Sequence, residues 1–145
     1  MTQKKSKMVK NIPAQGEIVD KEMIPLLFCF KDKKKKEKKA YASLKIAESE
    51  EERKVGLSKT ERLGPASGMF FTKAGSFWMP PEMRFPLDIV FIDKHGTVLE
   101  KKAMPLDNGR GRYQSFEPGV EYAVELPLGF CDKHNIVNGD ILSLE

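Results

Sequence analysis

The stretch PLDIVFIDKHGTVLEKKAM, residues 86–104, carries the strongest structural signal in this chain of 145 residues. From 88 to 93 the apolar side chains fall on both faces of an extended chain, which is typical of a strand covered on both sides. The Lys-His-Gly sequence at 94–96 then provides a turn with glycine at the position of positive φ. The chain is therefore expected to return over 97–101 as the partner strand of a hairpin.

Shorter apolar segments around this hairpin predict the rest of a sheet. Strands are expected at 22–30, 41–47, 68–71, 75–79, 121–126 and 140–144. The Pro80–Pro81 pair ends the strand at 75–79, because proline cannot donate a ladder hydrogen bond. Glycine and proline between 105 and 119 predict a long loop, whose NGRGR segment at 108–112 either binds an anion or is a mobile part of the surface.

Two short helices complete the prediction. The first begins at Ser49, where Ser49 and Glu52 have the spacing of a capping box, and Gly56 ends it after about two turns. The second is expected at 128–135. The fold class is therefore mainly β (α+β), as a small β-barrel-like or curled antiparallel sheet with two short helices.

The basic residues are concentrated at the N-terminal end of the chain. Residues 1–40 hold 12 lysines and 5 acidic residues, whereas residues 41–145 hold 13 basic and 16 acidic residues. The formal charge of +4 thus divides into +7 and −3. The polar, aperiodic stretch at 1–21 is typical of a flexible lysine-rich arm, and 22–145 of one β-rich domain with a lysine-rich hairpin loop at 31–39.

These lysines are candidates for binding an anionic partner. They are Lys4, Lys5, Lys7, Lys10, Lys33, Lys34, Lys35, Lys36, Lys38 and Lys39. The expected partner is an acidic protein surface or a large assembly such as a virus-like particle. Nonspecific nucleic acid is the alternative, since lysine gives phosphate affinity without base stacking. A third interpretation is a solvated hairpin tip that only resists aggregation.

Several classes of function find no support in the sequence. No apolar run approaches the roughly 20 residues that span a bilayer, so no membrane contact is expected. No signal peptide is recognised, so the chain is expected in the cytoplasm or within a large particle. Cys29 and Cys131 are expected to be reduced core thiols. His95 and His134 lack partners at ligand spacing, so neither a metal site nor a cofactor is predicted, and no catalytic residues are assigned.

Asp88 is the carboxylate that most needs an explanation. It enters an apolar strand, where burial is costly unless the carboxylate is hydrogen-bonded. It either accepts backbone N–H groups and holds the 80–86 loop, or it lines a ligand pocket with Trp78 and Met79. Arg53, on the surface of the first helix, could pair with a carboxylate nearby. The pocket would make the domain a ligand-binding protein or small enzyme, as alternatives to the favoured non-enzymatic binding or assembly module.

The order of the motifs resembles the domain of unknown function 192 family over about residues 44–144. The matching segments are LKIAESEEERKVGL, GMFF, SFWM, PLDIVFID, VELPLG and the Gly139–Asp140 pair. The resemblance implies a small β-barrel-like fold with short helices and implies no reaction.

This chain also departs from the family pattern. Pro80, Pro81 and Glu82 stand where members usually have Lys-Asn-Thr or a similar sequence. Thr60 stands in place of a usual arginine, although Arg62 is near. If those family positions form a polar site, part of that site is lost here.

Overall fold

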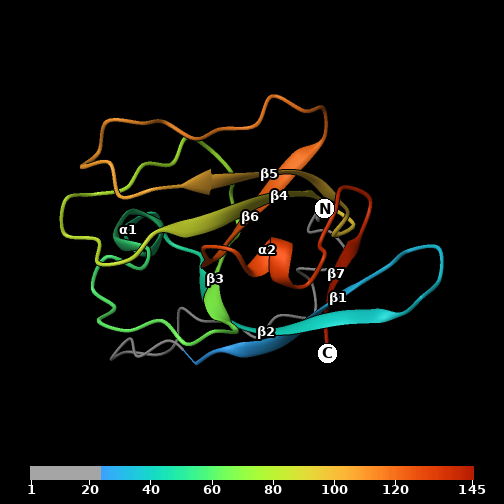
Figure 1. Cartoon of the computed structure of the whole chain (residues 1–145). Helices are drawn as coiled ribbons and strands as arrows, with labels where there is room; N and C mark the ends of the chain where they lie inside the picture. The colour runs from blue at the N-terminus through green and yellow to red at the C-terminus, as the bar shows by residue number, and fades with distance from the viewer. Residues whose placement is uncertain (1–23) are drawn as a thin grey trace.

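The computed structural model describes residues 24–145 (Figure 1). Within that range, seven strands form one sheet: β1 (Leu26–Lys31), β2 (Lys38–Ala47), β3 (Ser67–Phe71), β4 (Leu87–Asp93), β5 (Val98–Met104), β6 (Val120–Pro127) and β7 (Ile141–Leu144). The two helices are α1 (Glu50–Val55) and α2 (Phe130–Lys133). The arm expected at 1–21 lies outside the described residues.

The strands are ordered β5-β4-β6-β3-β2-β1-β7, and the sheet curls without closing. Its two ends approach each other, because Val98 N donates to Asp140 O at 2.8 Å and Leu142 N donates to Gly96 O at 2.8 Å. Figure 1 shows α2 in the opening between the two halves of the curl. The expectation of a mainly β, curled sheet is confirmed.

One pair of strands departs from the expected antiparallel arrangement. β2 and β3 are parallel, with Leu44 opposite Gly68, whereas every other named pair is antiparallel. A parallel pair needs a long crossover, and α1 with the loop that follows it supplies one. This crossover brings α1 onto the outer face of the sheet.

The sheet has an apolar cluster on each face. The first core lies inside the curl and takes Val90, Val124 and Phe130 among others. The second core lies on the outer face and takes Phe71, Leu87 and other residues of β3, β4 and β6. Successive residues of a strand point to opposite faces, so β4 contributes to both cores and is buried along almost its whole length.

One local expectation is corrected, and the structure gives the contacts of a loop that had two open interpretations. Residues 75–79 do not form a strand; only Phe77 makes a bridge, to Tyr113. In the NGRGR loop, the N–H groups of Gly109 and Gly111 both donate to the Asp107 carboxylate, at 3.1 and 2.9 Å. The chain's own carboxylate fills the place that the sequence suggested for an anion.

Candidate functional site

A cavity of about 440 Å³ lies where the second core meets α1 and the 73–83 segment. Its walls are apolar and partly aromatic, and they include Leu57, Phe71, Phe77, Met79, Met83 and Leu87. A cavity of this size with such walls falls in the range of small-molecule sites.

The helix α1 forms one wall and owes its position to its cap. Glu52 N donates to Ser49 Oγ at 3.0 Å, and Ser49 N donates to Glu52 Oε1 at 2.9 Å. The capping box predicted from the sequence is thereby confirmed. The helix ends at Gly56, whose φ of +53° favours glycine.

The segment 74–80 forms the opposite wall. Phe77 is fixed by reciprocal backbone bonds with Tyr113, at 2.9 and 2.8 Å, and its ring meets Phe71 edge-on at 5.1 Å. Met79 is buried, whereas Trp78 is 44% exposed at the lip of the cavity. The guanidinium of Arg112 lies 5.2 Å from the centre of the Trp78 ring. Trp78 is therefore a lining residue and not part of the core.

Glu125 lies at the closed end of the cavity. It sits in the middle of the sheet on β6, opposite Met69 of β3 and Ile89 of β4, and is only 6% exposed. A Cβ on Gly56 would lie 3.9 Å from Glu125 Oε1, so the carboxyl group is beneath the end of α1.

The Glu125 carboxyl group has no hydrogen-bond or ion-pair partner among residues 24–145. Burial raises its pKa from 4.5 to about 8, because the charged form loses hydration without gaining a partner. The group is therefore mostly a neutral carboxylic acid at pH 7. A neutral acid offers one O–H donor and one carbonyl acceptor to whatever enters the cavity.

Cations outnumber anions at the open rim of the cavity. The charged rim residues are Glu50, Arg53, Lys54 and Lys73. Arg53 is half-buried and donates from Nη1 to the Glu48 carbonyl, while Lys54 and Lys73 are exposed. The rim is therefore attractive to an anionic group.

The structure brings three of the four predicted pocket residues together. Arg53, Trp78 and Met79 all line the cavity, but Asp88 does not. Since neighbours in a strand alternate, Leu87 faces the cavity and Asp88 faces the first core. There Asp88 Oδ2 accepts the Cys131 N–H at 3.0 Å, so it fixes α2 and not the 80–86 loop.

The Cys131 thiol is buried as well. Burial raises its pKa to about 12, which leaves the thiol unreactive.

Sequence reasoning missed Glu125, although a signal was present. In Tyr122-Ala123-Val124-Glu125-Leu126 one acid stands within an apolar strand. The same argument that drew attention to Asp88 applies to it. The position of Glu125 relative to Arg53 and Trp78 depends on the β2–α1–β3 crossover, and the apolar pattern of a single strand does not reveal that connection.

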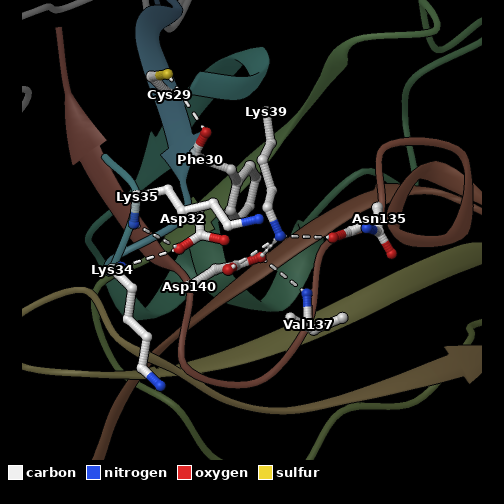
Figure 2. A network of polar contacts seen from close by, with 9 residues as sticks. All are labelled: Cys29, Phe30, Asp32, Lys34, Lys35, Lys39, Asn135, Val137 and Asp140. Atoms are coloured by element: carbon white, nitrogen blue, oxygen red, sulfur yellow. Dashed lines mark hydrogen bonds and ion pairs between the residues drawn. The ribbon is translucent and has the colours of Figure 1, made fainter. Parts of the chain in front are cut away.

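The lysines predicted to bind an anionic partner have different environments. Figure 2 shows the ammonium of Lys39 between Asp140, whose oxygens lie at 3.0 and 3.2 Å, and the carbonyl of Asn135 at 3.0 Å. The Lys39 side chain is only 15% exposed. Lys38 Nζ donates to Tyr41 Oη at 2.7 Å. Lys39 therefore ties β2 to the chain before β7 and is not available to a partner.

The hairpin tip between β1 and β2 exposes four lysines. Asp32 Oδ1 accepts the backbone N–H groups of Lys34 and Lys35, at 2.9 and 3.0 Å, as Figure 2 shows. This turn holds Lys33, Lys34, Lys35 and Lys36 exposed together. The other predicted lysines, Lys4, Lys5, Lys7 and Lys10, lie outside the described residues.

Residues 24–145 contain neither a metal-binding cluster nor a membrane-spanning helix. No group of three His, Cys, Asp or Glu side chains there is arranged to hold a metal ion. Neither described helix has the length and apolarity that crossing a membrane requires.

Comparison with known proteins gives a family and a fold. The DUF192 family model, described as an uncharacterised ACR, matches residues 31–144. The crystal structure of a proposed transcription regulator from Sinorhizobium meliloti 1021 is similar, with a TM-score of 0.75 and 23% identity over 84% of this chain and 95% of that one.

A second similar crystal structure is that of a protein of unknown function from Novosphingobium aromaticivorans DSM 12444. Its TM-score is 0.72 and its identity 19%, over 98% of this chain and 99% of that one. At these identities the likenesses establish the fold alone. Among curated proteins no significant match was found.

Proposed function

Since the chain belongs to the DUF192 family, whose description assigns it no activity, we propose a function from the site itself. The domain binds a small organic ligand in the cavity between α1 and residues 73–83. The observation that carries this proposal is the pairing of an apolar cavity of about 440 Å³ with one buried carboxyl group that has no partner among the described residues. An unpaired buried polar group costs about 1–3 kcal/mol, a cost that a bound ligand would offset.

The same geometry favours binding over catalysis. Acid–base and nucleophilic mechanisms need at least two positioned groups within hydrogen-bond reach of the reacting atoms. Among the residues that line the cavity, Glu125 is the one buried ionisable group, and the others stand at the rim. A single neutral acid in an apolar cavity can select and orient a ligand without further chemistry.

An NMR titration tests this function. The ¹⁵N-labelled protein is titrated with a set of small aromatic compounds, and shifts are expected at Gly56, Phe71 and Met79. Ala74→Phe, which places a ring in the cavity, should abolish those shifts. Ala66→Phe is the matched control, because Ala66 is exposed and does not line the cavity. Shifts that survive Ala74→Phe, or that never appear at the cavity for any compound, would refute the function.

The hairpin tip supports a second candidate function, docking on an acidic protein surface. Its supporting observation is the turn closed by Asp32, which displays Lys33–Lys36 at one place. In Figure 1 this hairpin tip projects on the side of the molecule away from α1. Docking through the tip and binding in the cavity are therefore compatible. Nonspecific nucleic acid remains the alternative partner for the same lysines.

A further inference from the structure

The two ends of the cavity differ in chemistry. At the closed end the Glu125 carboxyl group lies beneath Gly56, and at the open end Lys54 and Lys73 are exposed. The aromatic rings of Phe71 and Phe77 also line the cavity, and the Phe71 ring lies beside Glu125 beneath Gly56. A ligand that uses all three regions has a polar group, an apolar body and an anionic group.

The protonation state of the Glu125 carboxyl group determines which polar group of a ligand can pair with it. No cation interacts with Glu125, since Arg53, Lys54 and Lys73 stand at the rim, and burial keeps the acid protonated near neutral pH. A protonated carboxyl group presents a donor and an acceptor side by side. A primary amide presents the complementary acceptor and donor, so the two groups can form paired hydrogen bonds without burying a charge.

A cationic amine is the competing partner. It would have to lose its hydration and ionise Glu125 in the same apolar surroundings. The desolvation of two charges offsets most of their attraction in such a site. The observations therefore favour the neutral amide.

We propose that the cavity binds an aromatic amide with an anionic substituent, whose amide pairs with Glu125 and whose anion lies at the rim formed by Arg53, Lys54 and Lys73. The proposal rests on the proposed function of the same cavity and adds the chemical class of the ligand. The ring packs against the aromatic wall, where offset or edge-on contacts are favourable. The anion gains from the cationic rim, an attraction that salt weakens.

The probe for this inference is 4-carbamoylbenzoate, which carries an amide and a carboxylate at opposite ends of one ring. Two analogues serve as controls: 4-methylbenzoate lacks the polar group, and 4-(aminomethyl)benzoate carries an ammonium in its place. Affinities are measured by calorimetry at pH 7 and low salt. The amide should bind about tenfold more tightly than the methyl compound, the factor that corresponds to about 1.4 kcal/mol.

Two variants of Glu125 separate the amide from the cation. Glu125→Gln keeps a neutral donor and acceptor, so the advantage of the amide should persist. Glu125→Leu puts an apolar side chain of similar size in its place, so the amide and the methyl compound should then bind with about equal affinity. The Leu variant removes an unpaired buried group, so it is expected to fold. Lys54→Gln combined with Lys73→Gln should weaken all the carboxylate probes alike.

The outcomes distinguish the ligand class from the proposed function. Equal binding of the amide and methyl compounds, with cavity shifts for both, would overturn the class and leave the proposed function standing. Tighter binding of the ammonium compound, lost in Glu125→Gln, would also overturn it in favour of a cationic ligand. If neither these three probes nor the aromatic set shifts the cavity resonances, both the class and the function are refuted.

Discussion

At the scale of single residues, Asp88 and Glu125 show why burial alone does not identify a site. Both are acids in apolar strands, and both are nearly covered by protein. Asp88 accepts a backbone N–H, whereas Glu125 has no partner in the described part of the chain. The sequence marks such acids as unusual, but only the packing of other elements decides which of them is satisfied.

The unpaired state of Glu125 predicts an unusual dependence of stability on pH. Its pKa is about 8 in the folded protein against an ordinary value of 4.5, so the folded state retains a proton that the unfolded state has released. The contribution of Glu125 to stability is therefore fully present below about pH 4.5 and falls as the pH rises toward 8. The slope has an upper limit of about 1.4 kcal/mol per pH unit.

Glu125→Gln removes this dependence. Urea unfolding of the two proteins is measured at pH 5, 6.5 and 8. The free energy of unfolding of the Gln variant, relative to that of the wild type, should increase from each pH to the next. The comparison uses the difference between the proteins because other carboxylates also titrate near pH 5. A constant difference across the three values would mean that Glu125 is solvated or paired.

At the scale of the elements, features that depend only on residues close together in the sequence could be predicted from it. The alternation in β4 and the capping box of α1 are both local and both present. The strand expected at 75–79 is absent because Phe77 forms only an isolated bridge, to Tyr113. Both side chains pack against the second core, and Phe77 pairs with none of the seven strands. The parallel β2–β3 pair depends on the path of the crossover, which no local pattern contains.

The cap of α1 gives a prediction at this scale. Ser49→Ala removes the acceptor for the Glu52 N–H and should lower the free energy of unfolding by about 1 kcal/mol. Because α1 forms a wall of the cavity, the affinity for 4-carbamoylbenzoate should fall as well. The measurement is urea unfolding with calorimetry on the same samples. Ser76→Ala, at an exposed position of the opposite wall, is the control and should leave stability unchanged.

At the scale of the whole molecule, the hairpin tip and the cavity form two separate surfaces. Replacing Lys33, Lys34, Lys35 and Lys36 by Gln should leave unfolding unchanged, because these side chains are exposed. Attachment to an acidic polymer, measured with immobilised polyglutamate as a substitute for an acidic protein surface, should fall and should be weaker in higher salt.

Lys39→Gln is the contrasting variant. It leaves Asp140 buried without its cation and should cost about 2 kcal/mol of stability without changing attachment at the tip. Attachment to random duplex DNA that exceeds attachment to the acidic polymer, with a linear dependence on the logarithm of salt, would instead support nucleic acid as the partner. Attachment that the four replacements leave unaltered would exclude the tip as a docking surface.

In the described residues, β3, β4, β6, α1 and the 73–83 segment assemble a cavity around one unpaired carboxyl group. The most direct test of this arrangement is the titration of the Glu125 side-chain carboxyl carbon by ¹³C NMR, assigned by comparison with Glu125→Gln. We expect a single transition with a midpoint near pH 8, because burial without a partner raises the pKa to about 8. A midpoint near the ordinary value of 4.5 would contradict it, since the carboxyl group would then be hydrated or paired and the closed end of the cavity would not be as described.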